Sequence, residues 1–236
     1  MHPIHALLSL SALGGIAAAA TSIVQVKTCA AYLSGSPQPF TFDLFNPALG
    51  TLTSVTLGFT FTKSGGSLAV DNDGLTGGNV LFRHDVEGYL QSSDVVVGSS
   101  SAANTILARS SAIFFLDADD GDRLAPLPEV FNVGGPDYFL YDAATKTGTY
   151  AAEEIPAASW GAYSGNGSCN IDFMTIQSYS ASGVSDIKTL GLASSVTPIV
   201  TLTYNYVPEP AGLLLGSGVV VTVLRRRRVS LGRLGV

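Results

Sequence analysis

One stretch of the sequence decides the fold class: Val55-Thr56-Leu57-Gly58-Phe59-Thr60-Phe61-Thr62. Apolar side chains alternate with polar or small residues at every position of this stretch. Successive side chains of a β-strand point to opposite faces, so the pattern is typical of a strand with one face in a core and the other in solvent. The stretch therefore predicts a β protein.

Further strand-like segments lie on both sides of this stretch, and clusters of turn-forming residues separate them. The expected strands cover residues 23–27, 40–44, 55–62, 80–82, 95–97, 112–116, 138–141, 171–179 and 199–206. The expected turns, each with a glycine, are residues 34–37, 63–66, 71–74, 134–136 and 164–167. The best helix candidate is short, at residues 101–109. Short strands at this spacing predict one all-β domain over residues 21–206, an antiparallel β-sandwich that is jelly-roll-like.

The C-terminal segment, residues 207–236, has three successive parts. Its first part is Val207-Pro208-Glu209-Pro210, whose prolines disfavour a helix and lack N–H donors, so an exposed, extended tripeptide is expected. An uncharged apolar run follows at residues 211–224, and a basic tail at residues 225–236 begins with Arg225, Arg226, Arg227 and Arg228. The run would cover roughly 21 Å of a hydrocarbon layer about 30 Å thick. It predicts a short transmembrane helix with the arginines on the cytoplasmic side.

This order of a Pro-Glu-Pro motif, an apolar segment and an arginine cluster resembles a PEP-CTERM sorting tail. In that family an exosortase, a membrane-bound cysteine enzyme, recognises the tail and cleaves it near the tripeptide. The resemblance implies export to the cell envelope or beyond, often in bacteria that make extracellular polysaccharide. It covers about 30 residues, and the chain departs from the family pattern by continuing after the arginines to Val236.

The N-terminal segment, residues 1–20, predicts a secretory signal peptide. Residues 6–16 are apolar or small, and Ala18-Ala19-Ala20 offers the small-residue pattern that signal peptidase accepts, which places the mature start at Thr21. The segment before the apolar run contains no lysine or arginine. A signal peptide at one end and a stop-transfer segment at the other predict the same topology, with the body outside the cytoplasm.

The body between these two segments is strongly acidic. The whole chain has a formal charge of −6, and without the five tail arginines and Glu209 the body carries about −10. An acidic surface repels phosphates, so the composition argues against nucleic acid or anionic lipid as a partner.

The body also resembles choice-of-anchor E domains in one segment. Residues 45–57, Phe45-Asn46-Pro47-Ala48-Leu49-Gly50-Thr51-Leu52-Thr53-Ser54-Val55-Thr56-Leu57, are similar to the opening signature of that family. These exported domains carry a PEP-CTERM tail or another anchor, and a last strand running straight into the tail fits their layout. The resemblance implies where the protein is placed, not a chemical activity.

No motif of the body predicts catalysis. His84 is the only histidine after the signal peptide, no Gly-x-Ser-x-Gly elbow accompanies it, and we interpret it as a surface histidine. The chain has no cluster of His and Cys for zinc and no phosphate-binding glycine loop with a lysine. No pair of carboxylates stands out as a glycosidase pair, because the separation of such a pair is set in space.

One group of residues has the chemistry of a metal site: Asp117, Asp119, Asp120 and Asp122, with Gly121 among them. Calcium binds six to eight oxygen ligands, and extracellular sites of millimolar affinity fill readily. The pattern is not that of an EF-hand. The alternative is an acidic surface turn after a strand, which the sequence favours because Asp and Gly dominate turns. No other cofactor is expected.

The two cysteines and the aromatic residues leave alternatives open. Cys29 and Cys169 either form one disulfide in an oxidising compartment or are buried thiols. Trp160 with Tyr163, and the aromatic residues at positions 138–141, either stack on sugars or belong to the core. Aromatic side chains on strands are more often core, so we favour the second interpretation.

Together these features predict an exported cell-envelope or extracellular-matrix (biofilm) protein with a structural or adhesive role and no enzymatic activity. Signal peptidase and an exosortase are its expected partners during export, with transient membrane contact through residues 211–224. One alternative is a module that binds extracellular polysaccharide, which an exposed aromatic strip would favour. A second is an exported hydrolase, which two close, buried carboxylates in a cleft would favour.

Overall fold

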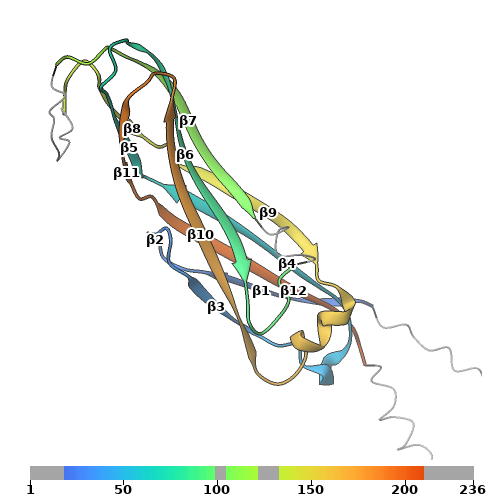
Figure 1. Ribbon diagram of the computed structural model, residues 1–236. Helices are drawn as coiled ribbons and strands as arrows, with labels where there is room; N and C mark the ends of the chain where they lie inside the picture. Colours follow the sequence, from blue (N-terminus) through green and yellow to red (C-terminus); the bar gives the residue numbers. More distant parts are fainter. Residues whose placement is uncertain (1–18, 99–104, 122–132, 210–236) are drawn as a thin grey trace, which may run out of the picture.

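The computed structural model describes residues 19–98, 105–121 and 133–209 (Figure 1). Nearly all regular structure in these ranges is β-strand, so the predicted all-β class is confirmed. The strands are β1 (Thr21–Thr28), β2 (Tyr32–Leu33), β3 (Gln38–Asp43), β4 (Gly50–Ser64), β5 (Ser67–Asn72), β6 (Gly78–Gln91), β7 (Ile106–Leu116), β8 (Tyr138–Asp142), β9 (Lys146–Glu154), β10 (Ser168–Ser182), β11 (Ile187–Leu192) and β12 (Ser195–Pro208). Two short 3₁₀ helices, η1 (Pro47–Leu49) and η2 (Ala157–Tyr163), complete the elements.

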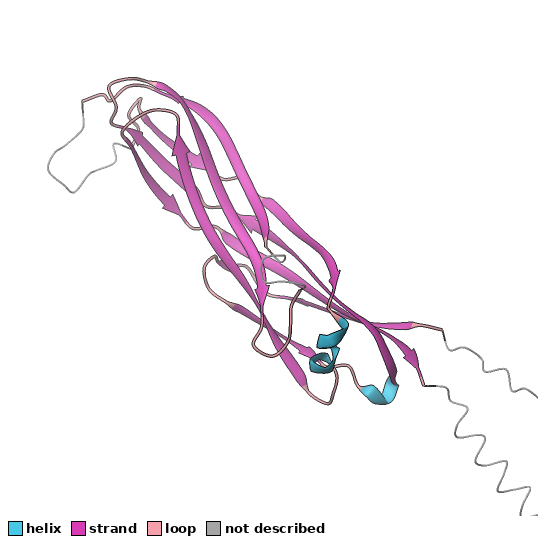
Figure 2. Ribbon diagram, turned by 45° about the vertical axis from the view of Figure 1, so that its right-hand side comes forward, coloured by secondary structure: helices cyan, strands magenta, loops and turns pink. Residues whose placement is uncertain are grey.

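The strands form three sheets in which all neighbouring strands run antiparallel. The first has the order β1-β12-β4-β9, with β2 beside the start of β12. The second has the order β3-β10-β6-β7, and the third has the order β11-β5-β8. Long strands dominate the arrangement, and the sandwich is elongated along them (Figure 2).

The third sheet continues the first one along the long axis of the molecule. Strand β4 leads into β5, β11 leads into β12, and β8 leads into β9, so corresponding strands have the same order in both sheets. Between β4 and β5 the chain turns at Gly65 and Gly66, whose φ angles of 66° and 83° favour glycine. One layer is therefore a continuous sheet, and the other is two sheets placed end to end.

Two hydrophobic clusters fill the space between the layers. The proximal cluster lies between the first and second sheets, and the distal cluster lies between the third sheet and the far half of the second. Buried members of the proximal cluster include Phe42, Phe59, Phe61, Val86, Phe173, Val200 and Tyr204. Buried members of the distal cluster are Leu68, Val70, Val80, Phe82, Leu116, Tyr141 and Ala143. The alternation along β6 supplies both clusters from the same strand.

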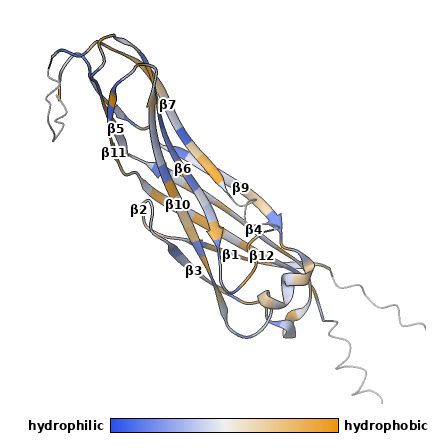
Figure 3. Ribbon diagram, viewed as in Figure 1, coloured by the Kyte–Doolittle hydropathy of each residue, from blue (hydrophilic) through white to orange (hydrophobic). Residues whose placement is uncertain are grey.

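Strands β1 and β12 bring the two described ends of the chain together. Thr21 pairs with Tyr206, so both ends leave the sandwich at its proximal end, while the third sheet forms the opposite, distal end (Figure 1). Hydrophilic residues occupy the loops at this distal end (Figure 3). Within the described residues, no helix has the length and apolar character needed to cross a membrane.

Two of the expected elements are wrong. Residues 95–97 are not a strand, and the helix candidate at residues 101–109 is contradicted from Ile106 onward, where β7 begins; residues 99–104 lie outside the described ranges. Pairing of β7 with β6 buries Ala108 and Ser110, so the long-range ladder outweighs a weak local helical preference. Four strands were not predicted: the two-residue β2, and β5, β9 and β11. All six residues of β5 are buried, so that strand lacks alternation.

Candidate functional site

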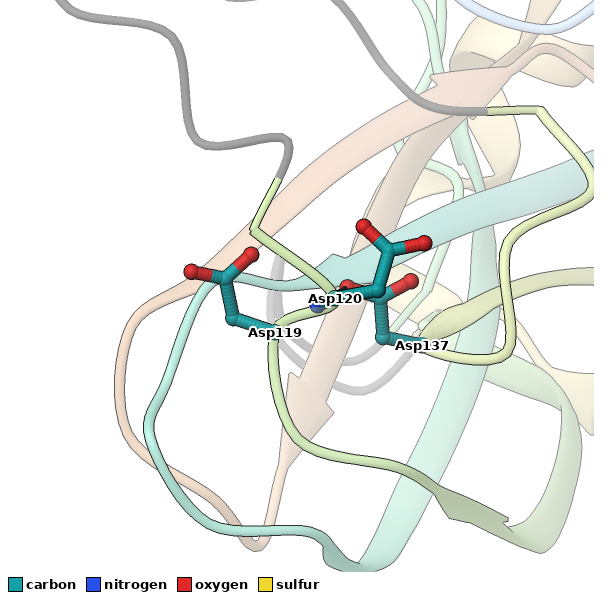
Figure 4. A group of neighbouring side chains, drawn as sticks. All are labelled: Asp119, Asp120 and Asp137. Carbon is teal, nitrogen blue, oxygen red and sulfur yellow. Dashed lines mark hydrogen bonds between the residues drawn. The ribbon is translucent and has the colours of Figure 1, made fainter.

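An acidic cluster lies at the distal end of the sandwich. It consists of Asp119 and Asp120, which follow β7, and Asp137, which precedes β8 (Figure 4). One carboxylate oxygen of each residue lies within 4.8 Å of those of the other two. The two ends of the single connection between β7 and β8 therefore contribute to one group of ligand atoms.

Asn72, a fully buried residue at the end of β5, holds the two ends of this connection together. Its side-chain amide donates to the backbone oxygens of Asp117 at 2.5 Å and Thr76 at 3.2 Å. Its backbone N–H donates to the oxygen of Asp137 at 3.1 Å. Asn72 thus fixes the backbone on both sides of the cluster, which buried polar groups do when every donor is paired.

Asp137 is the most enclosed member of the acidic cluster. Its side chain is fully buried, and its Oδ2 accepts a hydrogen bond from the backbone N–H of Asp120 at 3.2 Å. Its Oδ1 has no hydrogen-bond partner. Asp119 is half-buried and Asp120 is exposed, so the cluster is closed on one side and open to solvent on the other.

The structure changes the membership of the metal site that the sequence suggested. Asp119 and Asp120 belong to the cluster, Asp117 does not, and Asp122 lies outside the described residues. Asp117 is exposed, and its backbone rather than its carboxylate joins the network. Sequence reasoning missed Asp137, because only the folding of β8 beside β5 brings it to this place.

The neighbouring residues 71–74 do more than form the expected turn. Asp71 and Asn72 belong to β5 and are buried, and only Asp73 and Gly74 continue into the turn. Asp73 is also buried, and its Oδ2 lies 2.6 Å from Nζ of Lys188 on β11. The distal end therefore encloses the acidic side chains of Asp71, Asp73 and Asp137, and Asp73 forms a salt bridge with Lys188.

A second polar group lies between the two hydrophobic clusters, at the level where one layer is broken. We call it the buried polar belt: Lys63, His84, Gln177 and Ser194. Nζ of Lys63 lies 2.8 Å from Nδ1 of His84 and donates to the backbone oxygen of His84 at 3.2 Å. Both side chains are fully buried. A protonated Lys63 requires Nδ1 to be the acceptor, which places the imidazole proton on Nε2.

Hydrogen bonds and ring contacts join the rest of the belt. Oε1 of Gln177 accepts from the backbone N–H and the hydroxyl of Ser194, both at 2.9 Å, and from the hydroxyl of Ser34 at 2.6 Å. The ring of Tyr179 stacks on His84 with centroids 4.7 Å apart. Gly66 faces this group closely, because a Cβ there would lie 2.7 Å from Cε1 of His84.

Burial shifts the pKa of both basic groups in the belt. Burial, followed by the charge of Lys63, lowers the pKa of His84 to about 4. Burial likewise lowers the pKa of Lys63 to about 8, and the charge of Asp85 opposes this change. Each shift has the direction expected when the charged form loses solvent. Nε2 of His84 has no hydrogen-bond partner.

The prediction that His84 lies on the surface is wrong. The local sequence Arg83-His84-Asp85 looks polar, but along β6 the even-numbered side chains from Val80 to Leu90 point inward. Lys63 was placed in a turn and is buried as well. Continuing the alternation of residues 55–62 by one more inward position would have found Lys63.

Both cysteines are free in the structure. Cys169 is buried in the proximal cluster and Cys29 packs against it half-buried, so the alternative of buried thiols describes them. Burial raises the pKa of each thiol, which disfavours the thiolate needed for nucleophilic chemistry.

The aromatic candidates for sugar stacking belong to the core. Tyr163 and Tyr141 are buried, and Trp160 is half-buried with its Nε1 donating to the oxygen of Ile155 at 2.8 Å. Phe139 packs against the distal cluster, with its ring stacked on Phe114 at a centroid distance of 3.9 Å. These four rings fill the sandwich rather than form an exposed strip, while Tyr138 is half-buried and belongs to neither cluster.

The predicted sorting motif begins inside the last strand. Val207 and Pro208 pair with Thr51 and Gly50 at the end of β12, so they do not stand outside the folded elements as expected. A proline is tolerated at a strand end because it needs no partner for an N–H. Glu209 is exposed. Outside the described residues lie Pro210, Arg225, Arg226, Arg227 and Arg228, as well as residues 211–224 and nearly all of the predicted signal peptide.

Comparisons with known proteins give little to build on. No family model matches the chain, and no curated protein matches it. A structure of mud crab tombus-like virus is 9% identical over 92% of this chain and 94% of that chain, with a TM-score of 0.26. The T13 particle of infectious bursal disease virus (IBDV) is 14% identical over 87% of this chain and 47% of that chain, with a TM-score of 0.24. The chain thus spans about half of the IBDV chain, and TM-scores of this size carry no argument.

Proposed function

We propose that this chain is an exported, structural or adhesive β-sandwich of the cell envelope or extracellular matrix, sorted by an exosortase through residues 207–236. The observation that carries the proposal is the position of the two described ends. Thr21 and Pro208 both lie at the proximal end, and the distal end points away from them (Figure 1). A domain held at one end in this way presents its far loops to the surroundings.

The junction between the sandwich and the motif supports this proposal. The sheet continues through Val207 and Pro208, so the motif follows the folded body without a linker. Removal of everything after Pro208 would leave every described strand intact. Eight strands form two facing arrays in the orders β1-β12-β4-β9 and β3-β10-β6-β7, and this order supports the finer description as a jelly roll.

The structural role is favoured over the two alternatives. The aromatic residues that a polysaccharide platform would use are packed in the core, which weakens the case for a carbohydrate-binding module. Three carboxylates do come together in the acidic cluster, but only Asp137 is buried, while Asp119 is half-buried and Asp120 is exposed. The cluster is therefore not the pair of close, buried carboxylates that would favour a hydrolase. Three carboxylate oxygens close to one another suit a cation.

The experiment that tests the proposal is the intact mass of the protein recovered from the producing cells. We expect a species that begins near Thr21 and ends within residues 208–210. A matched chain with Glu209→Ala should accumulate with its tail uncut, because the change alters the motif without touching the sheet. Recovery of a wild-type species that still contains Arg225 to Arg228 would overturn the sorting proposal.

A further inference from the structure

We infer that the acidic cluster of Asp119, Asp120 and Asp137 binds one calcium ion at the distal end of the sandwich. It is the one place among the described residues where three side chains able to ligate a metal come together. The inference concerns the folded sandwich alone and does not depend on export or sorting. It goes beyond a structural role, because it makes the geometry of the distal loops depend on a cation.

The buried carboxylate of Asp137 is the observation that points to a ligand. This side chain is fully buried, and its Oδ1 has no hydrogen-bond partner. Burying an ionised carboxylate is costly unless a cation or hydrogen bonds compensate it. The salt bridges between Arg109 and Asp85 and between Lys188 and Asp73 do not involve Asp137. A bound cation would supply the missing partner.

The protein holds two of the three carboxylates, those of Asp119 and Asp137, in place before any cation arrives. The backbone N–H of Asp120 donates to Oδ2 of Asp137, and the N–H of Gly121 donates to Oδ1 of Asp119 at 3.0 Å. The N–H of Asp119 donates to the oxygen of Gly74 at 2.9 Å. Figure 4 shows the carboxylate of Asp137 directed toward that of Asp120. Ligands that are already ordered lose little conformational entropy on binding.

The chemistry of the donors selects calcium. The cluster contains carboxylates and no His or Cys, which excludes a site built for zinc or another soft metal. Calcium accepts six to eight oxygens in flexible geometry, so three carboxylates and water on the exposed side of Asp120 suit it. Magnesium demands a smaller, near-octahedral shell and keeps its waters, so it should bind more weakly. A site with three protein carboxylates and an open side should bind weakly, with a Kd of about 0.1–1 mM.

The test uses the full chain in mild detergent, stripped of metal with a chelator and then titrated with calcium chloride. We expect 10 mM calcium to raise the Tm by roughly 3–11 °C, and 10 mM magnesium to raise it less. Isothermal titration calorimetry should give one calcium per chain. An unchanged Tm and no binding heat at 10 mM calcium would overturn the inference, and an equal response to magnesium would overturn the selectivity.

Three variants separate a calcium site from an ordinary acidic turn. Asp137→Asn should abolish the calcium response and leave the metal-free Tm equal or higher, because the amide carries no charge into the interior. Asp120→Asn changes an exposed position, so it should fold and weaken calcium binding at least tenfold even if the Asp137 variant does not fold. Asp117→Asn is the matched control, since it alters the same loop outside the cluster and should retain the full response. A normal response in Asp120→Asn, or its loss in Asp117→Asn, would contradict this assignment.

Discussion

The proximal and distal clusters use the same kinds of side chain but are closed in different ways. Among the described residues, the proximal cluster buries 20 hydrophobic residues between two four-stranded sheets. The distal cluster buries seven and is bounded by the buried polar belt on one side and the acidic loops on the other. Because buried apolar area is the main favourable term in folding, the proximal half should dominate stability and the distal half should respond to its polar boundaries.

Aromatic rings fill both clusters. Phe173 contacts Phe59 and Phe61 in the proximal cluster, with ring centroids 5.5 Å and 5.6 Å apart. In the distal cluster, Phe82 contacts the rings of Phe114 on β7 of its own sheet and of Phe139 and Tyr141 on β8 of the facing sheet. Each ring buries a large apolar area, so removal of one from either cluster should be costly.

Removing a central ring should have the largest effect. We expect Phe173→Ala to lower the free energy of unfolding by roughly 3–5 kcal/mol, because it leaves a cavity between the first and second sheets. Urea denaturation followed by fluorescence measures this change. The distal counterpart Phe82→Ala should cost a similar amount locally.

Hydrogen exchange on the two ring variants tests whether the clusters unfold separately. Phe82→Ala should speed exchange in β5, β8 and β11 while amides of β4 and β12 stay protected. Phe173→Ala should reduce protection in both halves. Equal loss of protection throughout the Phe82 variant would mean that the two clusters form one cooperative unit.

Acid, acting on the buried polar belt, should have the next largest effect on stability. The pKa of His84 is about 4 in the folded protein against an ordinary 6.5. Between these values the unfolded chain binds a proton that the folded chain does not, so stability rises with pH in this window. Above pH 6.5 His84 does not change the free energy of unfolding. Below pH 4 it lowers the free energy of unfolding by roughly 3 kcal/mol. Lys63, with a pKa of about 8, should add a similar rise between about pH 8 and 10.5.

NMR titration of the imidazole signals checks the position of His84. Its signal should stay in the neutral form until the pH approaches 4. In a Lys63→Met variant the pKa should increase but remain below 6.5, because burial is the larger cause. Titration of His84 near 6.5 in the folded wild-type protein would show that the imidazole is solvated.

A pair of adjacent glycines measures how tightly the belt is packed. A Cβ at Gly66 would lie 2.7 Å from His84, whereas a Cβ at Gly65 would meet nothing within 4 Å. Both have positive φ, so Gly65→Ala should cost about 1–2 kcal/mol through its backbone alone. Gly66→Ala should cost roughly 1 kcal/mol more and should shift the His84 signal. Thermal unfolding of the two variants measures both losses of stability. Equal losses would mean that the buried polar belt rearranges to accept the added methyl group at no cost.

The outward face of β7 should show the smallest effect. Phe115 is 62% exposed, while its neighbour Phe114 points inward against Phe82. Phe115→Ser should therefore change the free energy of unfolding by less than about 0.5 kcal/mol. Phe114→Ser should be clearly destabilising in the same urea assay. A large loss for Phe115 would indicate that this face is covered.

The local sequence pattern predicted strands that have one solvent-exposed face. It failed where both faces of a strand are buried, or where pairing with another strand decides the structure. Residues 55–62, 138–141 and 171–179 lie within β4, β8 and β10. Strand β5 escaped prediction because its buried Asp71 and Asn72 have the composition of a turn. In β7, the first residues were assigned to a helix because the local pattern does not show that they pair with β6.

Only part of the acidic cluster could be predicted, because the sequence shows local patterns and not which distant residues meet. Asp119 and Asp120 were singled out because charged residues concentrate around them. Asp137 was not, since nothing near it in the sequence suggests a buried carboxylate. Its role follows from Asn72, whose hydrogen bonds join the two ends of the connection between β7 and β8.

The sequence by itself determined the fold class, since period-two alternation and glycine turns are local properties that need no knowledge of partners. It also supplied the expectation of an exported body with a sorting tail. Only the tertiary structure decided that one layer breaks into two sheets, that Lys63 and His84 meet between two cores, and that Asp137 joins Asp119 and Asp120. The physical reason is that burial and charge pairing depend on which distant strands become neighbours, and that choice is made by the whole chain.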